Sequence, residues 1–572
     1  MKKHILSVMI VIVILLLMSS VSAMDAIFDQ ESSQIRISGK LDKEYAGKYV
    51  SLCMANKNDP KDIGWIGQTE VKADGSYDFR FEFSKKVSDY TVTVNQNNEI
   101  LTPSIADASA VTSLYKVKAE GTFDVNKVTV SISVSDFRDS GSKKCTLIVV
   151  GYDAGGCMTD VKVLPDLTTD GLAEKKDFTF DVNKNVEYAK VMLWESLDSL
   201  MPYDGSSTIS RHKYDEYITR RGDIGNIFKK LDTEKQAVIG FVGGSVTQGT
   251  GLETEREDID SWRGLVGEWF KTQYKDADIT LVNAAIGSSG SNLADYRLQK
   301  DILSKNPDMV FIMFFINDVY CNDGSYTTSY VTSVIEKIRK ANPDCDIVML
   351  FETDKYVNDY LKEGTNMHEI AWLQDKVADY YDVTTINMGR AMQDYIRAMP
   401  GGINGNWSKY FTDNVHPTQL GYSFYAEVIK EYLSNEKRNV IEGSETEKHQ
   451  LPETPYVAYK PTTMVEADDI QLTENTGWSK GDAKAQIGSF SRALTSKNLN
   501  DCFVFDFKGS ELSIFMYGGD FSYSIDGGEL KKCDANQNRP KNIVRSLEPG
   551  KHSVKIVNTS GSNIDIYAML YR

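Results

Sequence analysis

A serine, a histidine and an aspartate of this 572-residue chain have the types and spacing needed for nucleophilic acyl transfer. Ser245 lies in the segment GGSVTQG, directly after the apolar run VIGFV, and its hydroxyl needs a base to take its proton during attack on a carbonyl. Asp413 precedes His416 in the segment DNVHP, so its carboxylate can reach Nδ1 of the imidazole and leave Nε2 for the serine. We therefore predict that these three residues are catalytic.

Other interpretations of the same segments are weaker. The segment GGSVTQG lacks the GK[ST] ending of a P-loop, contains no G-x-G-x-x-G motif, and has Thr247 where a G-x-S-x-G nucleophile elbow needs glycine. A helix-capping role is the structural alternative for Ser245. The other five histidines fall in the N-terminal segment, in regions outside the α/β part of the chain, or in an expected helix: His4, His212, His449, His552 and His368.

Attack on a carbonyl places negative charge on its oxygen, and N–H donors must be arranged there in advance. Asn317 follows the apolar run 309–316 and can supply a side-chain amide. The loop NAAIGSSG, which follows the run ITLV, can supply backbone N–H groups. We therefore expect an oxyanion hole built from Asn317 and from this loop.

The elements that must position these groups alternate between strand and helix. From 238 to 433, short apolar runs alternate with amphipathic segments, which predicts a parallel sheet covered by helices on both faces. The run 309–316 carries no charge, as expected of a central buried strand. Ligands of open α/β sheets bind at the carboxyl ends of the strands, so Ser245, Asn317 and the NAAIGSSG loop are expected to meet at one edge.

Period-two alternation on both sides of this region predicts further β-modules. The predicted organisation is a secretory signal peptide at 1–23, β-sandwich modules at 24–117 and 118–205, and a three-layer (αβα) domain at 206–435. A charge-rich linker at 436–455 and a C-terminal β-sandwich or jelly roll at 456–572 follow. The pattern LIVVGYD…VMLWESLDSLMPY of the second module resembles β-modules that precede the catalytic domains of secreted bacterial surface enzymes.

In order and rough spacing, the segments GGSVTQG, NAAIGSSGS, FFIND and DNVHP resemble the four blocks of SGNH/GDSL hydrolases, over about residues 236–435. The resemblance implies that Ser245 is the nucleophile and also an oxyanion donor, that Asn317 is a second donor, and that His416 is the base oriented by Asp413. The segment GGSVT departs from the GDSL pattern in a way that resembles carbohydrate esterases. The oxyanion glycine of the second block aligns with either Gly287 or Ser288.

Together these features predict a secreted bacterial serine esterase that needs no cofactor or metal and removes O-acetyl groups from plant polysaccharide such as xylan, mannan or pectin. The alternatives are a lipase acting on lipid esters and a non-catalytic carbohydrate-binding surface protein. Trp262 and Trp407 are candidates for stacking on sugar rings, with core or loop packing as the alternative for each. A net charge of −17 disfavours nucleic acid as a partner.

The cysteines and one acidic segment leave questions open. Seven scattered cysteines contain no CxxC motif, and both local disulfides and buried free thiols are compatible with their spacing: Cys145 with Cys157, Cys321 with Cys345, and Cys502 with Cys533. The segment Asp534-x-Asn536-x-Asn538 lacks the glycine and glutamate of an EF-hand, so we reject that form of calcium site.

Overall fold

The structure is a computed structural model that describes residues 25–29, 34–83, 89–94, 115–136, 141–200, 202–321, 324–357, 361–441, 444–453, 462–534 and 539–572. The predicted signal peptide lies outside the described residues, as do Asn536 and Asn538 of the acidic segment. The chain divides into two units, Met1–Lys213 and Tyr214–Arg572, which are described separately. In the part of the chain that the structure describes, no helix has the length and apolar character to cross a membrane.

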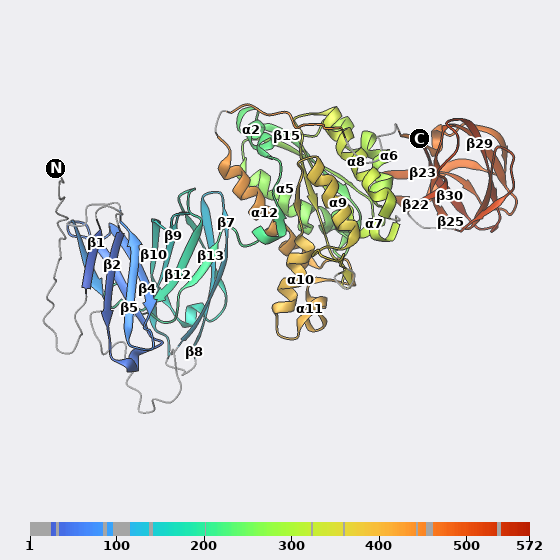
Figure 1. Ribbon diagram of the computed structural model, residues 1–572. Helices are drawn as coiled ribbons and strands as arrows, with labels where there is room; N and C mark the ends of the chain where they lie inside the picture. Colours follow the sequence, from blue (N-terminus) through green and yellow to red (C-terminus); the bar gives the residue numbers. More distant parts are fainter. Residues whose placement is uncertain are drawn as a thin grey trace. The chain divides into compact units, whose positions relative to one another are not determined.

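The first unit consists of antiparallel β-sheets in two modules (Figure 1). The first module has sheets β1-β2-β5 and β4-β3-β6, and the second has sheets β10-β9-β12-β13 and β11-β8-β7. The strands are β1 (Asp25–Asp29), β2 (Gln34–Lys40), β3 (Tyr49–Asn56), β4 (Ile63–Glu70), β5 (Ser76–Glu82), β6 (Tyr90–Val94), β7 (Tyr115–Asp124), β8 (Lys127–Asp136), β9 (Lys144–Tyr152), β10 (Met158–Thr168), β11 (Lys176–Asp181), β12 (Tyr188–Trp194) and β13 (Ser207–Ser210).

Strand β9 is buried on both faces, which explains its continuous apolar run. Leu147 and Val149 face the core of the second module, whereas Ile148 and Val150 pack in a cluster with Ile66 of β4. The two modules therefore share an apolar interface. Strand β13 pairs with β12, so the second module extends beyond the predicted boundary at residue 205.

The second unit begins with a six-stranded mixed sheet of order β14-β19-β18-β17-β15-β16. All neighbouring strands are parallel except β14, which pairs antiparallel with β19 and makes the sheet mixed rather than purely parallel. The strands are β14 (Ile218–Thr219), β15 (Gln236–Gly243), β16 (Asp278–Ala285), β17 (Met309–Met313), β18 (Asp346–Leu350) and β19 (Thr384–Ile386).

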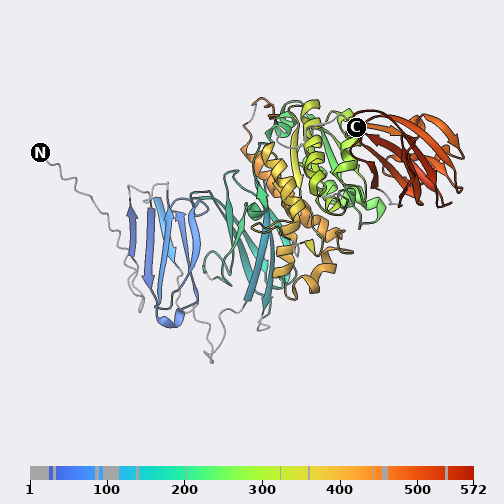
Figure 2. The ribbon, with the colours of Figure 1, turned by 45° about the vertical axis from the view of Figure 1, so that its right-hand side comes forward.

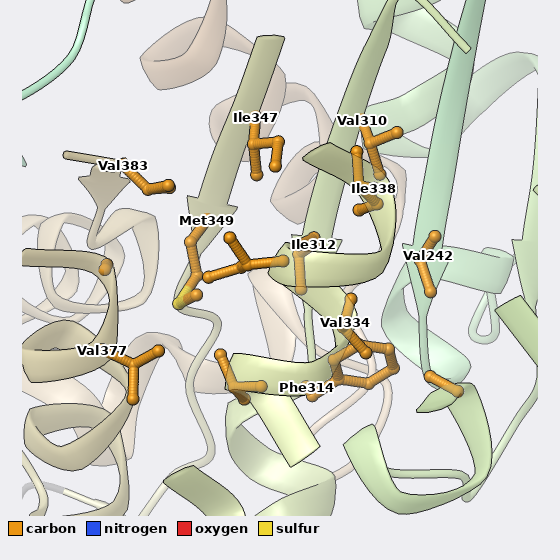
Figure 3. Packing of buried hydrophobic residues seen from close by; sticks show 14 of the residues in the cluster. Val242, Val310, Ile312, Phe314, Val334, Ile338, Ile347, Met349, Val377 and Val383 are labelled. Carbon is orange, nitrogen blue, oxygen red and sulfur yellow. The ribbon is translucent and has the colours of Figure 1, made fainter. Parts of the chain in front are cut away.

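Helices cover both faces of this sheet because its central strands are apolar on both sides. On one face, Val310 and Ile312 of β17 pack with Val334 and Ile338 of a covering helix (Figure 3). On the other face, the rings of Phe241 and Phe311 contact a tryptophan of a second helix. The helices are α2 (Gly225–Thr233), α3 (Ser245–Gln248), α4 (Glu257–Asp260), α5 (Trp262–Gln273), α6 (Ser291–Asp301), α7 (Phe315–Cys321), α8 (Gly324–Ala341), α9 (Glu369–Tyr380), α10 (Met388–Ala398), α11 (Gly402–Tyr410) and α12 (Gln419–Asn439).

The segment after α12 runs along the α/β domain. Helix α12 ends at Asn439, inside the predicted linker, and the described residues from 440 to 453 form no regular element. Nε2 of His449 lies 2.8 Å from Oδ1 of Asp346, and the side-chain amide of Asn226 donates to the carbonyl oxygen of Glu447 at 2.7 Å. The linker is therefore held on the surface of the domain.

The C-terminal β-domain (β20–β30) has two antiparallel sheets around one apolar core, and Figure 2 shows its strands in orange to red. The sheet orders are β22-β23-β30-β25-β28, with β20 added beside β30, and β21-β24-β29-β26-β27. The strands are β20 (Thr463–Glu466), β21 (Leu472–Thr476), β22 (Ser479–Ile487), β23 (Phe490–Ser496), β24 (Cys502–Gly509), β25 (Leu512–Gly518), β26 (Phe521–Ile525), β27 (Lys531–Cys533), β28 (Arg539–Val544), β29 (Gly550–Asn558) and β30 (Ile564–Tyr571).

The C-terminal β-domain packs directly on the α/β domain. A buried apolar cluster joins Ile286 and Leu293 to Ile487 and Phe490 of the β22–β23 hairpin. A buried ion pair adds to this contact, since Asp295 of α6 accepts from Arg572 at 3.3 Å and is fully buried. The hairpin is therefore fixed against the residues that precede and begin α6.

Six of the cysteines carry free thiols: Cys53, Cys145, Cys157, Cys345, Cys502 and Cys533. Two of the pairs for which the sequence permits a local disulfide, Cys145 with Cys157 and Cys502 with Cys533, are thus unbonded in this structure. Burial raises the pKa of Cys145 and of Cys533 to about 11, so both thiols are protonated and poorly reactive at neutral pH.

Candidate active site

Ser245 is the first residue of α3, where β15 ends at the carboxyl edge of the sheet. The turn beneath it needs glycine, because a Cβ atom on Gly244 would collide with the side chain of Asn317. Arg263 of α5, only 6% exposed, donates to the carbonyl oxygens of Thr247 and Gln248 at 2.8 Å each. These contacts fix the short helix that carries the serine hydroxyl.

His416 and Asp413 lie in the loop between α11 and α12, and the structure brings both to Ser245. Nε2 of His416 is 2.9 Å from Oγ of Ser245, and Nδ1 is 2.7 Å from Oδ2 of Asp413. The loop is closed on itself, because the N–H of Thr412 donates to the carbonyl oxygen of His416 at 2.8 Å. The aspartate at Nδ1 favours the tautomer with its proton there, which leaves Nε2 free to accept the serine proton.

Asp413 is held as a carboxylate. Partial burial raises its pKa, but the backbone N–H and imidazole of His416, together with the backbone N–H of Val415, lower it by more. Both backbone groups donate to Oδ1 at 2.7 Å. The net effect is a pKa below the ordinary value for aspartate, so the residue stays ionised and can stabilise a protonated imidazole.

The candidate oxyanion donors border the same serine. Asn317 lies in the first turn of α7, directly beyond β17, with its side chain beside Gly244. The backbone N–H of Gly287 donates to Oε1 of Gln248 at 3.0 Å. Ser288 has a φ of +62°, in the left-handed region, inside a turn closed by the N–H of Ser289 on the carbonyl oxygen of Ile286. Gly287 and Ser288 thus both lie beside the site. The N–H of Gly287 is already hydrogen-bonded to the side chain of Gln248.

The GDSL-like lipase/acylhydrolase family matches residues 241–424, a range that contains Ser245, Asn317, Asp413 and His416. This domain belongs to that family. The match lies within the α/β domain and covers less than half of the chain. No curated protein matches the chain.

Two solved structures are similar in fold to a large part of this chain. One is a two-domain esterase (CEX) active on acetylated mannans, with a TM-score of 0.52, 21% identity, and coverage of 63% of this chain and 98% of that one. The other is a two-domain esterase (CEX) active on acetylated mannans co-crystallized with mannopentaose, with a TM-score of 0.51, 20% identity, and coverage of 63% and 97%. At this identity the comparison establishes the fold.

A buried residue that the sequence analysis overlooked holds this GDSL site together. Asp318 is fully buried, accepts from the N–H and hydroxyl of Ser291 at 2.8 and 2.7 Å, and accepts from Gln374 at 2.8 Å. It therefore ties α7, which carries Asn317, to the start of α6. Burial raises the pKa of Asp318 to about 7, although these hydrogen bonds lower it. The one feature of the sequence that could have indicated this role is the position of Asp318 directly after Asn317 in FFIND.

The two tryptophans do not form the sugar-stacking wall that the sequence suggested. Trp262 is 0% exposed and packs against Phe241 and Phe311 in the core. Trp407 is 5% exposed, stacks on Phe411 and donates from Nε1 to the carbonyl oxygen of Asp413 at 2.7 Å. Neither ring has a free face for a sugar, and Trp407 instead supports the loop of the GDSL domain that carries Asp413.

Proposed function

We propose that this chain is a secreted serine esterase that removes O-acetyl groups from a plant polysaccharide through an acyl-enzyme. The observation that carries the proposal is the continuous hydrogen-bonded arrangement of Ser245, His416 and Asp413, with atoms 2.9 and 2.7 Å apart. Such an arrangement lets a neutral imidazole activate a serine hydroxyl.

In the first half of the proposed reaction, Oγ of Ser245 attacks the ester carbonyl while Nε2 of His416 takes the hydroxyl proton. The N–H of Ser245, the amide of Asn317 and an N–H from Gly287 or Ser288 donate to the resulting oxyanion. The intermediate collapses, and the sugar oxygen leaves with the proton from His416. Water then repeats the sequence on the acyl-enzyme and releases acetic acid, so the mechanism requires no cofactor.

The substrate class is supported by several independent features. The two solved structures described above are of an esterase active on acetylated mannans. The segment GGSVT resembles carbohydrate esterases, and the N-terminal sequence has the features of a secretion signal. We further infer that the two-sheet β-modules are sandwiches that present the catalytic domain to a polymeric substrate.

A screen for acetate release from acetylated xylan, mannan and pectin tests the proposal. Replacing Ser245 with alanine should lower kcat on a small aryl acetate by a factor on the order of 10⁴ or more, because the nucleophile is lost. The matched control is Ser423→Ala, which removes an exposed hydroxyl from α12 and should leave activity unchanged. Equal activity of Ser245→Ala and wild type would rule out this mechanism. Cleavage of long-chain lipid esters without acetate release from any glycan would favour a lipase instead.

A further inference from the structure

Two exposed tyrosines lie at the carboxyl edge of the central sheet, the edge at which Ser245 lies. Tyr320 of α7 is 59% exposed, and Tyr356, in the segment that follows β18, is 50% exposed. Strand β18 is the neighbour of β17, and α7 begins just after β17 (Figure 1). Exposed aromatic rings at the ligand-binding edge of an α/β sheet are candidates for binding. The stacking role for which both tryptophans are too buried is therefore open to these two rings.

Helix α7 places Tyr320 beside a candidate oxyanion donor. Tyr320 follows Asn317 by three residues in this helix, and side chains three residues apart lie on the same face. The side chain of Asn317 lies beside Gly244, which immediately precedes the nucleophile. The hydroxyl of Tyr320 donates to Oδ2 of Asp354 at 2.9 Å. The ring of Tyr320 therefore spans from α7 to the segment after β18.

Tyr356 is placed beside the catalytic loop by the residue before it. The N–H of Lys355 donates to the carbonyl oxygen of Asn414 at 2.9 Å, and Asn414 belongs to the segment DNVHP that carries His416. Nζ of Lys355 lies 5.8 Å from the centroid of the Tyr356 ring, at the outer limit of a cation–π contact. Tyr356 thus directly follows a residue that is hydrogen-bonded to the loop of the catalytic base.

One buried carboxylate holds both tyrosines. Asp354 is 5% exposed, and while its Oδ2 accepts from the hydroxyl of Tyr320, its Oδ1 accepts from the N–H of Tyr356 at 2.7 Å. The carbonyl oxygen of Asp354 accepts from Nε2 of Gln393 at 2.7 Å and from the hydroxyl of Thr353 at 3.0 Å. Groups that are held in place before a ligand arrives lose less entropy when it binds. The pair is therefore preorganised for a ligand.

The chemistry of the two side chains fits sugar rings. A phenol ring presents a large, flat and mostly apolar surface with only two side-chain torsions, and the C–H face of a pyranose ring can stack on it. A glycan whose acetyl ester lies at Ser245 has further sugar units that must cross the rim of the site. We propose that Tyr320 and Tyr356 form a stacking site for these neighbouring sugar units. This inference rests on the proposed function and assigns the residues that favour a glycan over a small ester.

The first test compares substrates through one product, acetate. Values of kcat/KM are measured for acetylated manno- and xylo-oligosaccharides and for ethyl acetate, which carries no sugar. Tyr320→Ala and Tyr356→Ala should each lower the ratio of the oligosaccharide value to the ethyl acetate value by about 2-fold to 10-fold, the size of other aromatic stacking contacts. An unchanged ratio in either variant would overturn the paired site, even if both substrates were turned over more slowly.

Further variants separate stacking from other roles of these residues. Tyr356→Phe retains the ring and should retain the wild-type ratio, whereas a loss as large as that of Tyr356→Ala would assign the effect to the hydroxyl and overturn stacking. The matched control is Tyr395→Ala, because Tyr395 of α10 is also an exposed tyrosine, at 42%. It should keep the wild-type ratio. If Tyr320→Ala does not fold, as judged by circular dichroism, the Tyr356 variants still decide.

Calorimetry separates the failure of this inference from failure of the proposed function. The Ser245→Ala protein does not consume its ligand, and it should bind the acetylated oligosaccharides about 2-fold to 10-fold more tightly than a protein that carries both Ser245→Ala and Tyr356→Ala. Equal affinities would overturn the stacking site and leave the esterase proposal intact, provided that wild type releases acetate from the same oligosaccharides. If wild type releases none, the proposed function fails, and this inference fails with it.

Discussion

The variant Ile286→Ala should damage catalysis through a contact outside the reacting atoms. Ile286 is 2% exposed and packs with Ile487 and Phe490 of the C-terminal β-domain, and a Cβ on Gly488 would fall 2.7 Å from its Cγ1. Cutting a buried isoleucine back to alanine costs about 2–5 kcal/mol of folding free energy. The turn that follows carries Gly287 and Ser288, the two candidate oxyanion donors of this loop, and one oxyanion donor is worth about 10²-fold to 10³-fold in kcat. If the turn after Ile286 becomes less ordered, its N–H donor is held less well, so kcat should fall about 10-fold.

The assay compares kcat and KM on a small aryl acetate, measured well below the melting temperature of each protein. The matched control is Ile514→Ala, because Ile514 is 0% exposed in the core of the C-terminal β-domain and belongs to a different apolar cluster. Both variants should unfold at lower denaturant concentration, but only Ile286→Ala should turn over more slowly. If the two variants have the same kcat as wild type, the oxyanion turn does not depend on this contact and the reasoning is wrong.

Three further outcomes are expected. Asn317→Ala should lower kcat on aryl acetate by about 10²-fold to 10³-fold with little change in KM, because its amide acts on the transition state. Trp407→Phe removes the hydrogen bond to the carbonyl oxygen of Asp413 and should destabilise the protein by about 1 kcal/mol in urea unfolding, without raising KM for oligosaccharides. Burial raises the pKa of Asp318 to about 7 from 3.8, so its contribution to stability is complete below pH ~4 and is lost as the pH rises toward 7. Urea unfolding from pH 4.5 to 7.5 should show this loss, at up to ~1.4 kcal/mol per pH unit, and Asp318→Asn should remove its share of the slope.

The strands of the central sheet could be predicted from the sequence because each one is a short apolar run that needs no information from the rest of the chain. The uncharged run 309–316 was expected to be a buried strand, and Met309–Met313 forms the fully buried β17. Phe315 and Ile316 of the run instead begin α7, and this change from strand to helix leaves Asn317 beside Gly244 at the carboxyl end of the strand. The two-residue strand β14 is too short to show a period, so its antiparallel pairing was not foreseen.

Features that depend on the meeting of distant segments could not be predicted in this way. Composition marks Trp262 and Trp407 as aromatic, but which side of each ring is covered depends on elements elsewhere in the chain. Arg297 appears in the sequence as one more charge on an amphipathic helix. Arg297 is buried because it lies near the edge strand β16 and the C-terminal β-domain. No sequence pattern near residue 297 indicates that these distant segments meet there.

The C-terminal β-domain is consequently more than an appended module in this fold. Its hairpin packs on Ile286, which precedes one candidate oxyanion donor, and its last residue, Arg572, contacts Asp295 of α6. Helix α6 is in turn tied through Ser291 and Asp318 to the helix that carries Asn317. Both segments that carry the candidate oxyanion donors thus contact a network anchored in the C-terminal β-domain. A domain joined only by a flexible linker could bind glycan, but it could not support the site in this way.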